Sequence, residues 1–248
     1  MKTRQDYPNR LPLKNLYNLR DIGGYMTRDG KITSFGRFLR SEAPLYLTDP
    51  ELAELMTYPL QSVIDLRSPN EARHQPHALS HVPGIRYERV ALLGSDINAT
   101  VAQADALITG RPSTLGDLYL FMLEHSKKEF ARIFKIFEET QDGAVLFHCT
   151  HGKDRTGLVA MLLLLLAGVS DHDIIANYQV SRTYLQPLFD QTADQIPDSL
   201  RPYLNSDASN MEQALEWMHG HFPTAADYLS SCGVSRSTMD VVRARLIG

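Results

Sequence analysis

The spacing of hydrophobic and polar residues predicts alternating strands and helices in the first half of the chain. Residues 62–66 and 144–147 are short, mostly apolar segments, typical of buried strands, and residues 86–92 predict a third strand. Apolar side chains recur at helical spacing over residues 115–139, with a break near His125, which predicts two helices. Strands that alternate with helices indicate an α/β fold.

Capping residues indicate where several helices begin and end. The capping boxes at residues 48–51 and 68–71, each with an early proline, predict two short helices. Thr156 can cap a long apolar helix that ends at Gly168. Each of these signals acts over about one turn, so it predicts a helix end and not a tertiary contact.

The second half of the chain is dominated by predicted helices. Helix starts are indicated at residues 170–173 and 209–212, and two more helices, separated near Gly233, complete the chain. No internal repeat and no linker rich in Ser, Gly or Pro divides the sequence. We therefore expect a single domain over residues 1–248, with a helical C-terminal layer.

Composition and charge narrow the class of protein. The chain has 248 residues, 43% of them hydrophobic, with 25 Lys and Arg against 29 Asp and Glu. This mild acidity does not favour a nucleic-acid surface. The longest apolar run, residues 158–169, is shorter than the roughly 20 residues that span a bilayer. Two cysteines and no visible signal peptide predict a cytoplasmic protein without transmembrane segments, although a signal removed earlier would leave the same sequence.

The most informative stretch is the loop between the strand at residues 144–147 and the apolar helix. It contains Cys149 and, shortly after it, Arg155, just before the helix. A loop between a strand end and a helix N-terminus is a natural anion site, because backbone N–H groups and the helix dipole favour negative charge there. We therefore interpret this segment as a phosphate-binding loop.

Each residue type in this loop has a chemical use. Cys149 can attack phosphorus as a thiolate and form a phosphocysteine. Arg155 presents a planar fork that can bind two phosphate oxygens. Gly152 permits a tight turn, His148 could hold the loop or the thiolate, and Thr156 could donate to the sulfur as it departs.

Other interpretations of the loop fit less well. A nucleotide-binding P-loop would need glycine where Phe147 stands. A zinc site built from His148, Cys149 and His151 lacks a second pair of ligands, so no metal is predicted. An isolated buried cysteine beside an unrelated surface arginine would not explain the strand before the loop and the helix after it.

Four segments together resemble the bacterial and fungal tyrosine/serine subfamily of the cysteine-dependent protein tyrosine phosphatases. The signature loop at residues 148–157 is joined by similar segments at residues 18–25, 38–41 and 63–68, the last followed by Glu71. The resemblance runs from about Asn18 to the C-terminus and is weak between residues 94 and 115. Several members of that family are secreted, whereas nothing in this chain suggests export.

The resemblance implies a protein tyrosine phosphatase-like fold, with a central, mostly parallel sheet flanked by helices. It also implies hydrolysis of phosphotyrosine without metal or organic cofactor, with phosphoserine, phosphothreonine and phosphoinositides as further candidate substrates. Phosphate or vanadate would be active-site ligands. Substrate-binding roles fall on five residues of the loop and helix start: Thr150, His151, Gly152, Lys153 and Thr156.

Lys153 has two interpretations. In similar proteins, lysine beside the Asp-Arg pair accompanies activity on phosphoinositides, and a point charge at the pocket mouth would suit a multiply phosphorylated ring. Alternatively, Lys153 only completes the positive field of the loop.

Three carboxylates are candidates for the general acid that protonates the leaving oxygen. Asp154 is the first choice, because it lies in the loop beside Arg155, although it could instead orient an arginine or a backbone N–H. Asp65 is second, since it ends a predicted strand. Its alternative role is a salt bridge to one of three arginines: Arg20, Arg40 or Arg155. Asp117 is third and lies at a predicted helix start.

Two further segments have open roles. Arg20 and Asp21 could join the site, but a buried ion pair that fixes the turn at residues 23–24 is preferred. Residues 94–115 could form a lid over the active site or a solvated insertion.

Three other functions remain as rivals. The chain could bind phosphate without turnover, or hydrolyse a small phosphorylated metabolite. Sulfur transfer or arsenate reduction also uses such loops, and arsenate reduction usually needs a second thiol. Cys232 is the only other cysteine, and its default interpretation is a small buried residue.

Overall fold

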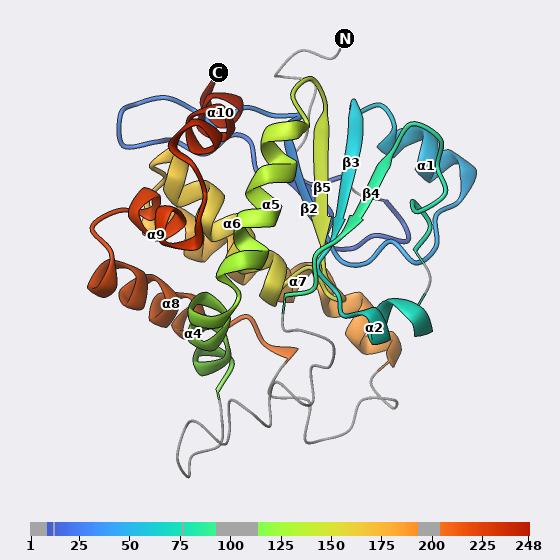
Figure 1. Ribbon diagram of the computed structural model, residues 1–248. Coiled ribbons are helices and arrows are strands. Elements are labelled where there is room, and N and C mark those ends of the chain that lie inside the picture. The colour runs from blue at the N-terminus through green and yellow to red at the C-terminus, as the bar shows by residue number, and fades with distance from the viewer. Residues whose placement is uncertain (1–8, 12, 76, 93–113, 193–203) are drawn as a thin grey trace.

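A five-stranded sheet forms the centre of the computed structural model, which describes residues 9–11, 13–75, 77–92, 114–192 and 204–248 (Figure 1). The strands lie in the order β1-β2-β5-β3-β4. β1 pairs antiparallel with β2, and every other neighbouring pair is parallel. The strands are β1 (Arg20–Asp21), β2 (Phe38–Ser41), β3 (Leu60–Asp65), β4 (Arg86–Arg89) and β5 (Ala144–His148).

Helices follow most of the strands and make up the second half of the chain, so the predicted α/β class with a helical C-terminal layer is confirmed (Figure 1). Within the described residues, no helix is both long and apolar enough to cross a membrane. The helices are α1 (Asp49–Leu55), α2 (Pro69–His74), α4 (Leu115–His125), α5 (Lys127–Glu139), α6 (Asp154–Ala167), α7 (Asp171–Thr192), α8 (Ala208–His221), α9 (Ala225–Cys232) and α10 (Arg236–Ile247).

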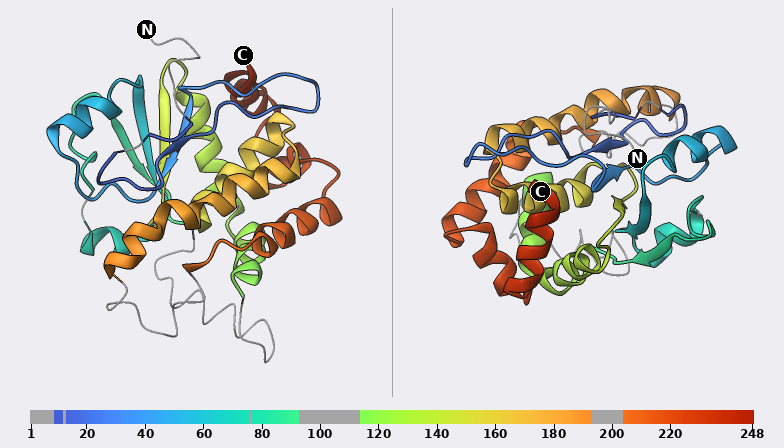
Figure 2. Two further views of the ribbon diagram at one scale, coloured as in Figure 1. Left: turned by 180° about the vertical axis from the view of Figure 1, so that it is seen from behind. Right: turned by 90° about the horizontal axis from the view of Figure 1, so that it is seen from above.

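Alternate residues of the strands supply two separate cores. Phe38 and Phe147 face the cluster that contains α5 and α6, whereas Leu39 and Leu146 face the cluster that contains Leu55 of α1. This alternation follows from the two-residue period of a strand. Figure 2 shows α1 and α5 on opposite sides of the sheet.

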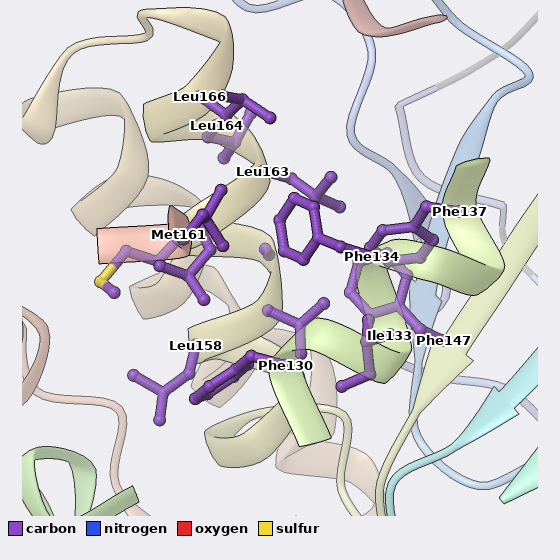
Figure 3. Packing of buried hydrophobic residues seen from close by; sticks show 14 of the residues in the cluster. Phe130, Ile133, Phe134, Phe137, Phe147, Leu158, Met161, Leu163, Leu164 and Leu166 are labelled. Carbon is purple, nitrogen blue, oxygen red and sulfur yellow. The ribbon is translucent and has the colours of Figure 1, made fainter. Parts of the chain in front are cut away.

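The apolar helix α6 is buried almost throughout because other helices surround it. Its leucines pack against the aromatic face of α5, and Phe147 of β5 closes the cluster (Figure 3). The ring centroids of Phe137 and Phe147 lie 5.8 Å apart at a steep angle, an edge-to-face contact. The packing anchors both elements that flank the phosphate loop, namely β5 before it and α6 after it.

Most local predictions hold, but α8 begins at Ala208, just before the predicted start at residues 209–212, and β4 ends at Arg89 and not at residue 92. Both capping boxes are present, and Gly168 ends α6 in the left-handed conformation with a φ of 85°. The predicted cap at Thr156 is wrong: α6 begins at Asp154, so Thr156 lies inside the first turn. A capping residue needs an extended backbone, which a residue inside the helix does not have.

The parallel strands direct their carboxyl ends to one edge of the sheet. β2 ends at Ser41, β3 at Asp65 and β5 at His148, and these three residues are neighbours in register. In an open α/β sheet, ligands bind outside this edge. The segment proposed as a lid lies outside the described residues, except for residues 114 and 115 at the start of α4.

Candidate active site

The phosphate loop, residues 149–155, joins β5 to the first turn of α6. Cys149 is the first residue after the strand and is 2% exposed, so it lies at the base of the loop. Arg155 lies in the first helical turn, where the unpaired N–H groups of the helix are also found. The structure therefore brings together the two residues that the sequence singled out.

Asn18 and Arg40 bind the second half of the phosphate loop from outside. Asn18 Nδ2 donates to the carbonyl oxygens of His151, at 3.0 Å, and Gly152, at 3.2 Å. Arg40 Nη2 donates to the carbonyl oxygens of Gly152, at 2.8 Å, and Lys153, at 3.4 Å. Three successive carbonyls are thus held away from the concave side of the loop.

The two carbonyls at the start of the loop are bound in the same way. The Cys149 oxygen lies 3.1 Å from His148 Nδ1, and only the imidazole can donate to it. The Thr150 oxygen accepts from the backbone N–H of Ala43 at 3.1 Å. In a trans peptide the N–H points opposite to the preceding carbonyl. The N–H groups of residues 150–154 therefore point away from these donors, to the concave side of the loop, an arrangement that can bind an anion.

The backbone at Gly152 accepts no other residue type without strain. Its φ is +65°, a conformation that disfavours other residues. A Cβ there would lie 2.2 Å from the carbonyl carbon and oxygen of Ser41, closer than real contacts allow. The tight turn expected of this glycine is present, and it lets the loop pack directly on the end of β2.

Glu71 holds Arg155 in a bidentate ion pair. Arg155 Nη1 and Nη2 each donate to one Glu71 oxygen at 2.7 Å. Burial alone would raise the pKa of Glu71, but hydrogen bonds from Arg155 lower it to about 2. Glu71 also accepts from the Thr150 hydroxyl at 2.7 Å and closes the capping box of α2 with the backbone N–H of Ser68. The sequence indicated only the capping role of this glutamate.

The remaining residues of the loop face different partners. Lys153 is 1% exposed, and its ammonium donates to the Asn205 carbonyl and lies 3.4 Å from Asp154. Lys153 is therefore not presented openly at a pocket mouth, which was one of its two interpretations. His151 makes an edge contact with Phe189. The buried hydroxyl of Thr156 has no hydrogen-bond partner among the described residues, so the expected bond to the sulfur is not formed.

Asp154 opens α6 beside Arg155 and is partly exposed, with 24% of its side chain accessible. Its Oδ1 accepts a hydrogen bond from the hydroxyl of Tyr119, which lies 2.8 Å from the hydroxyl of Tyr178. These two tyrosines come from α4 and α7, and no sequence pattern pointed to them. They fix a carboxyl group that can still reach solvent or a ligand.

Asp65 ends β3 as predicted, but its partner differs from the three arginines expected. Its carboxylate accepts from Arg67 Nε at 2.9 Å and Arg67 Nη2 at 2.8 Å, and from the Tyr87 hydroxyl at 2.6 Å. Although burial alone would raise it, these donors keep the pKa of Asp65 well below its ordinary value. The expected salt bridge to Arg20, Arg40 or Arg155 is corrected to Arg67, because the chain turns sharply after the strand.

Asp117 has a structural position. Its carboxylate closes the capping box of α4 with Thr114 and accepts from Gln213 Nε2 at 3.1 Å. These contacts account for its place at the helix start.

Arg20 and Asp21 are both buried, but they do not form the expected ion pair. Asp21 accepts from the backbone N–H groups of Gly23, at 2.8 Å, and Gly36, at 2.7 Å. Arg20 donates to the Asn177 carbonyl at 2.7 Å. Their side chains point to opposite faces because they are adjacent in a strand. Asp21 therefore fixes the turn through the backbone alone.

Cys232 lies at the end of α9, buried in the helical layer. Burial raises the pKa of its thiol to about 11. Both cysteines are free. The interpretation of Cys232 as a small buried residue is confirmed.

Comparison with known proteins adds an independent finding. A family model described as "Tyrosine phosphatase family" matches residues 11–248. A tyrosine-protein phosphatase of Nostoc commune is 34% identical over 84% of this chain and 74% of its own length. A protein of Cupriavidus necator, provisionally named a tyrosine-protein phosphatase, is 31% identical over 96% of this chain and 87% of its own length.

A solved structure, TpbA of P. aeruginosa, covers 81% of this chain and 90% of its own. Its identity is 13% and its TM-score is 0.41, values too low to carry a conclusion about the site.

Proposed function

The chain belongs to the tyrosine phosphatase family, and from this premise we propose that it hydrolyses phosphotyrosine through a phosphocysteine formed on Cys149. The observation that carries the proposal is that five successive loop carbonyls accept from donors outside the loop, which turns the N–H groups of residues 150–154 the other way, in a loop that begins at the buried Cys149 and ends at Arg155. Such a nest binds the oxygens of a phosphate group, and the thiolate lies where it can reach the phosphorus.

In the first step the Cys149 thiolate attacks phosphorus and the bond from phosphorus to the tyrosine oxygen breaks. The developing charge on the three equatorial oxygens is stabilised by the loop N–H groups and by Arg155. Glu71 takes one N–H from each terminal nitrogen of the guanidinium, and Nη2 also donates to Thr150 Oγ1 at 3.3 Å, so Nε and the second N–H of Nη1 remain for phosphate. The pair thus pre-organises the clamp before substrate arrives.

The departing tyrosine oxygen needs a proton, and we propose Asp154 as its source. The carboxyl group lies beside Arg155 and is oriented by the Tyr119 hydroxyl. In the second step a water attacks phosphorus, Asp154 takes its proton, and the bond from sulfur to phosphorus breaks to release phosphate and thiolate. No atom outside the protein, the substrate and water is required.

The proposal is tested by phosphate release from matched phosphotyrosine, phosphoserine and phosphothreonine peptides and from phosphoinositide vesicles, with EDTA present. We expect the phosphotyrosine peptide to be the best substrate, since both curated relatives carry that name. Vanadate should inhibit reversibly because it mimics the five-coordinate transition state. Turnover that requires added metal, or release only from a small phosphorylated metabolite, would contradict the proposal.

Phosphoinositide hydrolysis has less support. The ammonium of Lys153 donates to the Asn205 carbonyl and lies near Asp154. A second phosphate group would have to compete with these two partners for it. If the rate on phosphoinositide vesicles exceeded the rate on the phosphotyrosine peptide, phosphoinositides would become the preferred substrate class.

The assignment of Asp154 predicts a dependence on the leaving group. Asp154→Asn should lower kcat on a phosphotyrosine peptide by about 10²-fold, because general acid catalysis contributes about 10²–10⁴-fold. The loss should shrink for an aryl phosphate with a much more acidic phenol, since that phenolate leaves without a proton. Rate measurements on both substrates check this.

Asp117→Asn serves as the matched control for the rival acid. It should reduce thermal stability slightly, through loss of the negative charge in the first turn of α4, but leave the leaving-group dependence intact. If Asp117→Asn abolished that dependence and Asp154→Asn did not, the assignment would be reversed.

A further inference from the structure

A second histidine, His77, contacts His148 at the start of the phosphate loop. His77 follows α2, is 7% exposed, and places its Nε2 2.7 Å from Nε2 of the fully buried His148. The two ring centroids are 4.6 Å apart, and His77 also makes an edge contact with Tyr87. Two imidazole nitrogens at this distance share one proton.

The surrounding hydrogen bonds determine which nitrogen carries each proton. The backbone N–H of Leu79 donates to His77 Nδ1 at 2.9 Å, so this nitrogen is unprotonated. In a neutral His77 the proton is then on Nε2 and is donated to His148 Nε2. His148 must therefore carry its own proton on Nδ1, which faces the Cys149 carbonyl at 3.1 Å. All three hydrogen bonds are satisfied by one arrangement of protons.

We propose that His77 is a positioning residue of the active site. By donating to His148 it selects the tautomer that holds the Cys149 carbonyl out of the nest. The N–H of Thr150, on the same peptide, is thereby aimed at the thiolate and the phosphate.

Nearby charges explain why such selection is needed. Asp65 Oδ1 lies 3.9 Å from His148 Nε2 and would attract a proton on that nitrogen. His148 Nδ1 would then be an acceptor facing the carbonyl oxygen, and the hydrogen bond would be lost. Arg67 binds Asp65 and, together with Arg155, opposes a positive imidazole.

The pair is neutral at the pH of an ordinary assay. Burial lowers the pKa of His77 to about 2 and that of His148 to about 4, and the charge on Arg67 also lowers both. Asp65 opposes these shifts, and Arg89 adds to the lowering at His77. The selection therefore concerns tautomers and not a change of charge.

The first test is the tautomer itself, observed by ¹⁵N NMR of histidine-labelled protein between pH 6 and 8. We expect His148 as the Nδ1–H form and His77 as the Nε2–H form. An Nε2–H form of His148 in the wild type would overturn the proposal without any variant or any turnover.

The second test compares His77→Gln, which retains a donor toward His148, with His77→Phe, which keeps ring packing and removes the donor. His77→Phe should lower kcat about tenfold with little change in KM, the size expected for one lost hydrogen bond. It should also raise the pH midpoint for iodoacetamide alkylation at Cys149, read by mass spectrometry, and His77→Gln should restore much of both.

The kinetic effect rests on the proposed function, whereas tautomer and alkylation do not depend on turnover. An unchanged alkylation profile and tautomer in folded His77→Phe would refute the positioning role even if phosphatase activity were absent. If His77→Phe fails to fold, the tautomer of wild-type His148 and the alkylation profile of His77→Gln still test the proposal.

Discussion

Cys149→Ser is expected to lower kcat on a phosphotyrosine peptide by at least about 10⁴-fold while the protein still binds the peptide. Removal of a catalytic nucleophile has costs of this order. A serine hydroxyl has no adjacent base here, because His148 directs its Nδ1 to the Cys149 carbonyl and its Nε2 to His77. The loop N–H groups and Arg155 remain, so a peptide titration should give a Kd within a few-fold of the wild-type KM.

Cys232→Ser is the matched control, since it changes the other thiol in a helix that does not contribute to the site. It should retain wild-type kcat and still form the covalent intermediate. Acid quench of wild type with ³²P-labelled substrate should leave label on Cys149, and Cys149→Ser should carry none. Turnover that survives Cys149→Ser would contradict the cysteine mechanism.

The elements flanking the active site were predictable because their signals are local. The two capping boxes link residues three apart, and both form as expected. The strand before Cys149 and the apolar helix after it also follow from continuous patterns. The position of the phosphate loop therefore follows from the order of these two elements along the chain.

The supports of the phosphate loop were not predictable in the same way. β2 contains a fully buried arginine, Arg40, which interrupts the apolar pattern expected of a buried strand. Its partners are loop carbonyls more than a hundred residues later in the chain. No periodicity records such a contact, and only the resemblance of residues 38–41 to a known family hinted at it.

Asp65 illustrates the intermediate case. Its place at the end of a strand was correctly predicted, but its partner is Arg67, two residues later, and not a distant arginine. The side chains of Asp65 and Arg67 are both fully buried and only two residues apart, so they pair with each other locally. The candidate acid in the sequence thereby becomes a buried support of the loop that follows β3.

Arg155→Lys is expected to lower kcat/KM by about 10³-fold, the lower end of the range for arginines that stabilise phosphoryl transfer. Lysine keeps the charge but loses the fork, so it cannot bind Glu71 and two phosphate oxygens at once. Vanadate inhibition should weaken in parallel, because the same donors hold the five-coordinate state. Initial rates and vanadate titrations check both.

Arg86→Lys is the matched control, since Arg86 is also ion-paired, to Glu88 and Glu139, but on the surface. It should leave kcat/KM and vanadate inhibition unchanged. Equal losses in the two variants would mean that the effect comes from ion pairs in general and not from the clamp.

Glu71→Gln tests the contribution of the ion pair separately from that of the Arg155 guanidinium. Arg155 keeps its charge in this variant, so we expect a loss of about tenfold, much smaller than for Arg155→Lys. The pKa of Glu71 is lowered to about 2, so the stability that the pair contributes is present above the ordinary pKa of glutamate and is lost only as the pH falls towards 2. The acidic limb of the wild-type rate profile should therefore be unchanged in Glu71→Gln. An equal loss in both variants would assign the effect to the ion pair, and a larger loss in Arg155→Lys assigns it to the guanidinium that contacts phosphate.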